Sequence, residues 1–116
     1  MTVDDVAKLL AGFRLRYGTE RQLQDDVERA LEAERIPFIR ECRTSTGPID
    51  FLVEGAIGVE CKIAGGASQV LPQLQRYAAE PQIAGIVLVT SRPTHRFGVE
   101  TLGGVPFRTL WIAGNL

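Results

Sequence analysis

The segment Pro48-Ile49-Asp50-Phe51-Leu52-Val53-Glu54-Gly55-Ala56-Ile57-Gly58-Val59-Glu60-Cys61-Lys62 predicts two strands joined by a turn at Glu54-Gly55-Ala56. Apolar and polar residues alternate along both halves, which is the pattern of half-buried strands. Because successive side chains of a strand point to opposite faces, Glu60 and Lys62 share one face. Pairing of the two strands brings Asp50 close to Glu60. The segment therefore predicts two carboxylates and one lysine in one place.

The residues Pro48-Ile49-Asp50 and, ten positions after the aspartate, Glu60-Cys61-Lys62 resemble the motif of the PD-(D/E)XK nuclease superfamily. This is the fold of many restriction enzymes and Holliday junction resolvases, and Ile49 is an insertion that leaves Asp50 in place. In pattern the chain is most similar to small resolvase-like or VRR-type stand-alone nucleases of phages or mobile elements. The resemblance implies an α/β, restriction endonuclease-like core. Its elements would follow the order helix, helix, three strands, helix, two strands, with a central mixed sheet of four to five strands flanked by helices.

The same resemblance implies a chemistry for the motif residues. Phosphodiester hydrolysis needs the phosphate charge to be neutralised and a water to be made nucleophilic, and a hard divalent cation held by carboxylates supplies both. Asp50, Glu60 and the backbone carbonyl of Cys61 would hold Mg²⁺ or Mn²⁺, and Lys62 would orient or help to deprotonate the attacking water. The alternative interpretation is a simple surface ion pair between Glu60 and Lys62.

Two helices are predicted before the hairpin. Thr2 and Asp5 form a variant of the capping box ahead of a first helix over 3–13. Thr19 and Gln22 fit a capping box for a second helix, which ends at Ile36-Pro37.

Glu20 is the candidate third acid. At about 100° per residue it lies on the apolar face of the second helix, which is directed at the sheet. The resemblance implies that a helix before the sheet supplies a catalytic and metal-binding acid, and Glu20 matches that position, with Glu28 as the fallback. The alternative is a first-turn acid that interacts favourably with the helix dipole.

A third helix is predicted from Ser68 or Gln69 to Glu80, with a late start because Pro72 is tolerated only in the first turn. Its stretch from Val70 to Tyr77 resembles the helix after the Glu-x-Lys strand of resolvase-like members, where a Gln and a Tyr approach the active site. Gln73 and Tyr77 are therefore candidate site residues. An ordinary amphipathic helix is the alternative.

Further strands are predicted over 38–44, 85–90 and 105–112, the last at an edge of the sheet because of Pro106. Candidate phosphate contacts lie on the first of these strands and in the loop after the second. A solvated surface is the alternative for these side chains. The four candidates are Arg40, Arg43, Arg92 and Arg96. The only histidine, His95, is predicted to be exposed and without a catalytic partner.

The composition is that of one globular domain of 116 residues with a net charge of −1, which does not mark a nucleic-acid binder. Lysine occurs only at Lys8 and Lys62, whereas Arg supplies eleven of the thirteen basic residues. Cys42 and Cys61 are predicted to be reduced, buried thiols inside strands. The acidic N-terminus and the lack of a long apolar run predict a cytoplasmic protein without a membrane span.

The single-domain size leaves little area for sequence recognition, since specific protein–DNA interfaces bury on the order of 1,000 Å² or more. We therefore expect structure-selective cleavage, or cleavage of low sequence specificity, of DNA that is possibly branched, by a homodimer with two sites related by a two-fold axis. Two alternatives stay open: a catalytically silent nuclease-fold protein that binds DNA or regulates a partner, and a small protein-interaction module. The sequence does not distinguish DNA from RNA.

Overall fold

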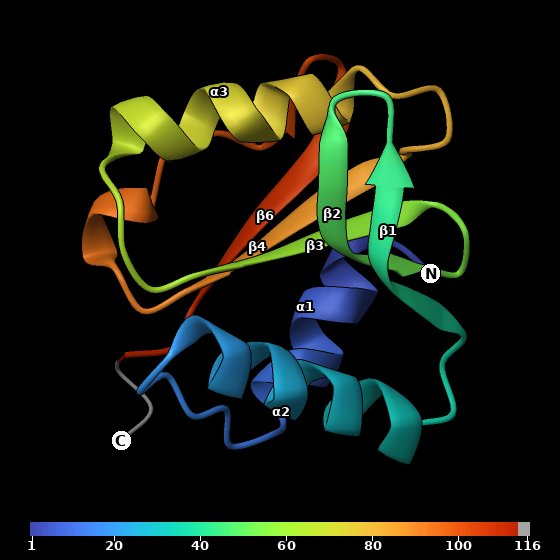
Figure 1. The fold of residues 1–116 in the computed structure, drawn as a ribbon, viewed down its shortest axis with the longest axis vertical. Coiled ribbons are helices and arrows are strands. Elements are labelled where there is room, and N and C mark those ends of the chain that lie inside the picture. Colours follow the sequence, from blue (N-terminus) through green and yellow to red (C-terminus); the bar gives the residue numbers. More distant parts are fainter. Residues whose placement is uncertain (114–116) are drawn as a thin grey trace.

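The computed structural model describes residues 1–113 and shows a mixed six-stranded sheet with α1 and α2 on one face and α3 on the other (Figure 1). The helices are α1 (Val3–Ala11), α2 (Glu20–Ala33) and α3 (Ala67–Ala78), with a 3-10 turn, η1 (Pro93–His95). The strands are β1 (Phe38–Thr44), β2 (Gly47–Val53), β3 (Ile57–Lys62), β4 (Gly85–Thr90), β5 (Thr101–Leu102) and β6 (Val105–Trp111).

The spatial order of the strands is β1-β2-β3-β4-β6-β5. The first three form an antiparallel meander, β3, β4 and β6 run parallel, and β5 returns antiparallel to β6. A helix crosses over between β3 and β4, as parallel pairing requires. The predicted α/β class, the mixed sheet and the flanking helices are confirmed.

The sheet has six strands rather than the predicted four to five. The additional strand, β5, comprises only Thr101 and Leu102, which is too short for an alternating pattern to be recognised. It pairs with Val105 and Pro106, so the start of β6 is not at the edge of the sheet, as the sequence had predicted.

Helix α1 begins at the reciprocal capping box of Thr2 and Asp5, which confirms the prediction, and ends at Ala11. At the start of α2, Thr19 Oγ1 accepts from the Gln22 N–H (3.0 Å), but the Gln22 side chain accepts from the Gly18 N–H (2.9 Å) instead of closing a capping box.

Helix α3 differs more from its prediction. It starts at Ala67 with Gly66 as N-cap, instead of late after a Ser68 or Gln69 cap. Pro72 therefore lies in the second turn, where it cannot donate to the carbonyl four residues earlier. Burial of Val70 and Leu74 against the sheet stabilises the helix despite that missing bond.

A buried aspartate with two arginine partners fixes the loop that leads into α2. Asp26, 7% exposed, accepts from the backbone N–H (2.8 Å), Nε (3.0 Å) and a terminal nitrogen (2.8 Å) of Arg16, and also pairs with Arg29. The hydrogen bonds from the Arg16 guanidinium hold the pKa of the Asp26 carboxyl below its usual value. These bonds attach the loop after α1 to α2, the helix whose first residue is Glu20.

Strand β4 is buried along its whole length, as its continuous apolar run predicted. Within residues 1–113, no helix is long and apolar enough to cross a membrane.

Gly85, the first residue of β4, tests how closely α1 packs on the sheet. A Cβ at this position would lie 2.5 Å from Val3 Cγ1 and 3.1 Å from Ile57 Cδ1. We expect Gly85→Ala to lower the free energy of unfolding by about 1–3 kcal/mol, because a branched side chain yields little. Urea unfolding of Gly85→Ala, Val3→Ala and the double variant measures the effect. Costs that simply add in the double variant would contradict the contact between the two positions.

Candidate active site

The site lies where the regular pairing of β2 with β3 ends. The two strands pair from Val53 opposite Ile57 to Phe51 opposite Val59. At the next position, side chains replace the ladder: the Asp50 N–H donates to Glu60 Oε1 (2.7 Å) and the Cys61 N–H donates to Asp50 Oδ2 (2.8 Å). Both carboxylates therefore converge in the gap between β2 and β3.

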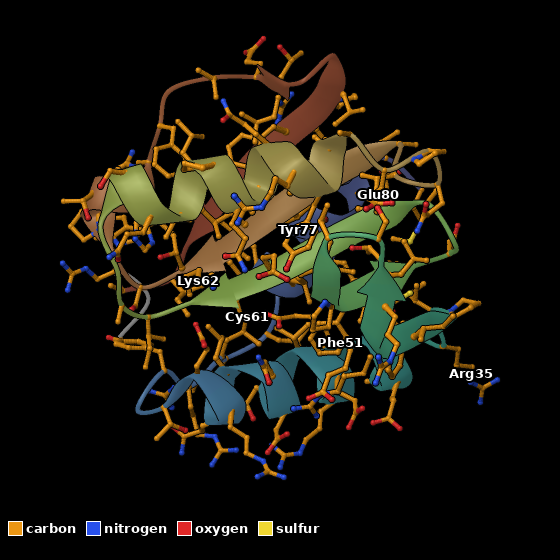
Figure 2. The ribbon with its side chains drawn as sticks, turned by 45° about the horizontal axis from the view of Figure 1, so that its top comes forward. Arg35, Phe51, Cys61, Lys62, Tyr77 and Glu80 are labelled. Carbon is orange, nitrogen blue, oxygen red and sulfur yellow. The ribbon has the colours of Figure 1, made fainter. Side chains whose placement is uncertain are left out.

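Lys62 joins this pair from the end of β3. Its Nζ lies 3.9 Å from Glu60 Oε2, and its side chain is 20% exposed while Glu60 is 2% exposed. In Figure 2, Lys62 lies near the end of β3, and Cys61 lies on the side of the sheet that α2 covers. The structure thus brings Asp50, Glu60 and Lys62 together, as the hairpin pattern predicted.

Burial and mutual repulsion set the protonation of the two carboxyls. Burial, reinforced by the charge of Asp50, raises the pKa of Glu60 to about 8. Burial also raises the pKa of Asp50, and the charge of Glu20 adds to this effect. Lys62 lowers both pKa values without reversing either shift. Since burial disfavours ionisation of both carboxyls and Lys62 is the one ammonium beside them among the described ion pairs, additional positive charge would favour the ionised forms.

Glu20, the first residue of α2, is the helix acid that faces this cluster. It is half-buried, and its charge raises the pKa of both Asp50 and Glu60. Glu28 instead lies 3.6 Å from the guanidinium of Arg40, so the fallback acid belongs to an ion pair between α2 and β1.

Gln24 is a site neighbour that the sequence interpretation missed. It lies one turn after Glu20 on α2, and its side-chain amide lowers the pKa of Asp50 by hydrogen bonding. The other end of the amide, Oε1, accepts from Arg40 (3.2 Å). The i, i+4 spacing from Glu20 was the available signal, because such residues share one helix face.

Two residues of α3 support β2 from the opposite face. The Tyr77 hydroxyl donates to the Pro48 carbonyl (2.7 Å), and Gln73 Nε2 donates to that hydroxyl (3.2 Å). Burial raises the pKa of Tyr77, and the charge of Glu60 adds to this effect. Gln73 and Tyr77 therefore fix the start of β2, two residues before Asp50.

The four candidate arginines are not gathered at the carboxylates. Arg40 pairs with Asp25 (2.8 Å) as well as Glu28 and lies 5.7 Å from the centre of the Phe51 ring, so its charge is matched within the protein. Arg96 lies 5.1 Å from the centre of the Trp111 ring. Arg43 and Arg92 are exposed, and neither takes part in an ion pair in the described part of the chain.

His95 and the cysteines differ from their predicted environments. His95 is fully buried instead of exposed, because both ring nitrogens have partners within the fold. Both thiols are free; Cys61 is buried, but Cys42 is only half-buried because β1 is an edge strand.

Over residues 1–113, no group of three or more His, Cys, Asp or Glu side chains is arranged to hold a metal ion. Two carboxylates converge, and Glu20 acts on them through its charge. Of the side chains predicted to bind a metal ion, Asp50 and Glu60 therefore converge, and Glu20 is the third acid that acts on them through its charge.

Comparison of the chain with models of known protein families, with curated proteins and with solved structures gives no match. A functional assignment therefore depends on the geometry of the site itself.

Glu60→Gln is expected to stabilise the metal-free protein at pH 8 and to have little effect at pH 4. The folded-state pKa of Glu60, about 8, lies above its ordinary value of 4.5, so the unfolded chain loses the proton first. The free energy of unfolding that the protonated Glu60 carboxyl contributes is fully present below about pH 4.5 and is lost as the pH rises through about 8. The loss is on the order of a few kcal/mol and is absent from the Gln variant.

Urea unfolding in EDTA at pH 4, 6 and 8 measures this effect. The control is Glu32→Gln, which changes an exposed acid of α2 and should follow the wild-type pH profile. Parallel pH profiles for the wild type and Glu60→Gln would contradict the prediction, because they would show that folding does not raise the pKa of Glu60.

Proposed function

We propose that this chain is a metal-dependent nuclease of the restriction endonuclease-like PD-(D/E)XK type that hydrolyses phosphodiester bonds of DNA. The observation that carries the proposal is the convergence of Asp50 and Glu60 where β2 and β3 part, with Lys62 beside them. The order of elements supports it, because two helices, a three-stranded meander, a crossover helix and a parallel strand match the core that the motif resemblance implies.

The donor chemistry of the site fits Mg²⁺ or Mn²⁺. Carboxylate oxygens are the ligands of hard divalent cations, and a bound cation would favour the ionised forms that burial and the neighbouring acids disfavour at Asp50 and Glu60. Asp50, Glu60 and the Cys61 carbonyl would hold the ion, with Glu20 completing its shell directly or through water. Mg²⁺ sites commonly use one or two carboxylates and several waters, so two converging side chains suffice.

When bound, the ion would neutralise phosphate charge and make a water nucleophilic at neutral pH. The residues of the chain supply the rest. Lys62 presents an ammonium beside Glu60, where it can donate to the attacking water and stabilise charge that develops on the phosphate. Burial of Glu60 strengthens these interactions because the local dielectric is low. Gln73 and Tyr77 maintain the strand that carries Asp50.

The overall charge restricts the mode of DNA binding. The net charge is −1, and Arg40 on β1 is paired with Asp25 and Glu28 within the protein. Cleavage that depends on DNA shape, or that has low sequence specificity, needs fewer base contacts than sequence reading does. A homodimer would place two sites about a two-fold axis and double the phosphate contacts, which suits a branched substrate.

A second candidate function is a nuclease-fold protein that no longer cuts and serves as a DNA-binding or regulatory subunit. It is favoured by the absence, within the described residues, of a group of three or more His, Cys, Asp or Glu side chains arranged to hold a metal ion. A protein-interaction module whose acidic cluster is incidental would bind neither the metal nor DNA.

Cleavage tests the proposal directly. The wild type is expected to cut at least one of four substrates (a four-way junction, linear duplex, single-stranded DNA and RNA) in Mg²⁺ or Mn²⁺, and to lose this activity in EDTA. Glu60→Gln and Lys62→Ala should reduce the rate by about 100-fold or more, since each removes a group that acts on the reacting atoms. Lys8→Ala, at an exposed position of α1, is the matched lysine control. Equal cleavage by wild type and Lys62→Ala would contradict the assigned site.

Calorimetry separates the enzyme from its alternatives. Mn²⁺ should bind the wild type at one site per chain, and Asp50→Asn should abolish the heat of binding because one of two carboxylate ligands is lost. Metal binding without cleavage of any substrate would favour the silent nuclease fold. Absence of metal binding would exclude both nuclease-fold accounts in favour of the interaction module.

A further inference from the structure

We propose that His95 is a positioning residue for this site: through the Gly65 carbonyl it fixes the loop that joins Lys62 to α3. The inference rests on the proposed function, since it assigns to His95 the placement of groups that the nuclease mechanism uses. The residue lies outside the PD-(D/E)XK motif, in η1 after β4.

His95 is fully buried and has a partner on each ring nitrogen. Nε2 lies 2.8 Å from the Gly65 carbonyl oxygen, and Nδ1 lies 2.7 Å from Thr90 Oγ1. A carbonyl only accepts, so Nε2 carries the proton, and the unprotonated Nδ1 of the neutral ring accepts from the Thr90 hydroxyl. Thr90 Oγ1 in turn accepts from the Arg92 N–H (3.0 Å). One tautomer of His95 therefore satisfies every polar group in this chain of bonds.

These bonds join three elements at one point. Gly65 follows Lys62 by three residues and precedes Gly66, the N-cap of α3, while Thr90 is the residue of β4 that pairs with Lys62. Gly65 adopts a φ of 92°, a conformation that is open to glycine but that residues with a side chain rarely adopt. The Ser91 N–H also donates to the Lys62 carbonyl (3.3 Å), so the segment around His95 contacts both ends of the loop.

The anchored loop determines the placement of site groups on both sides. Lys62 is the last residue of β3, and its ammonium lies at 3.9 Å from Glu60, a separation without a direct hydrogen bond to fix it. On the other side, the start of α3 sets the position of Tyr77, whose hydroxyl supports β2 at Pro48. A displacement of about 1 Å in a catalytic group costs on the order of 100-fold in rate, so loss of the anchor should reduce cleavage far more than a general loss of stability does.

Two substitutions of His95 test its two hydrogen bonds separately, because each variant can keep only one of them. His95→Gln places an amide N–H near the position of Nε2 and can keep the bond to Gly65, whereas His95→Asn is too short to reach Gly65 and can keep only the bond to Thr90. Cleavage is measured at saturating Mg²⁺ and well below the melting temperature of each variant. Leu102→Ala, a buried residue on β5 at the other end of the sheet, is the control for destabilisation.

We expect His95→Asn to lower the cleavage rate by about 100-fold, and His95→Gln and Leu102→Ala to remain within about tenfold of the wild type. Equal losses in Asn and Gln, or an equal loss in Leu102→Ala, would overturn the proposal. In ¹⁵N NMR, a His95 ring protonated at Nδ1 and unprotonated at Nε2 would overturn it as well.

Amide NMR signals of residues 62–66 distinguish failure of this inference from failure of the proposed function. If the wild type cuts nothing, the nuclease proposal fails, but signals unchanged in His95→Gln and broadened in His95→Asn still show that His95 positions Lys62. Signals unchanged in both variants would overturn the positioning role whatever the activity.

Discussion

The structure depends on an exchange of hydrogen bonds between two strands: the carboxylate of Glu60 accepts from the backbone of Asp50, and the carboxylate of Asp50 accepts from the backbone of Cys61. Where a ladder stops inside a protein, the freed N–H groups need other partners, and here side chains supply them. The strands can therefore separate without leaving buried donors unpaired. The same bonds hold two carboxyls in a dry gap, where burial raises both pKa values and makes the metal-free fold less stable as the pH rises.

The irregularity extends to the neighbouring strand. Arg40 pairs with Phe51 and Cys42 with Ile49, but Glu41, which lies between them and opposite Asp50, has a φ of 53° and no ladder partner. The sheet thus departs from regular pairing at one level across β1, β2 and β3. Such departures bend a strand and re-aim its side chains. Packing from both faces maintains the bend: the Arg40 ion pairs hold β1 to α2, and the Tyr77 hydroxyl holds β2 to α3.

Some features of the structure were predictable from the sequence and others were not. The difference follows from how local each interaction is along the chain. The hairpin, the capping box of Thr2 and the buried strand β4 depend on periodicity or on neighbours a few residues away, and these predictions were correct.

Strand β5 has two residues and no period, and the Gly66 cap has no side chain to signal it. The burial of His95 depends on a carbonyl thirty residues away in sequence, which no local pattern encodes. The grouping of Asp50 with Glu60 was predictable because strand pairing converts sequence spacing into proximity. For Gln24, the spacing from Glu20 indicated only the shared helix face, and its contact with the site depends on how α2 docks.

Net charge misleads about nucleic-acid binding when arginines are used to hold a fold together. Asp26 pairs with Arg16 and Arg29, Asp25 and Glu28 pair with Arg40, and Asp4 pairs with Arg108, so four of the eleven arginines are matched by acids within the described residues. An arginine balanced by two carboxylates and an aromatic face contributes little to phosphate attraction. In the proposed nuclease, neutralisation of the scissile phosphate therefore falls to a bound divalent cation and to Lys62. This division of roles explains how a chain with a net charge of −1 can act on a polyanion: the positive charge is needed at one point and is supplied there.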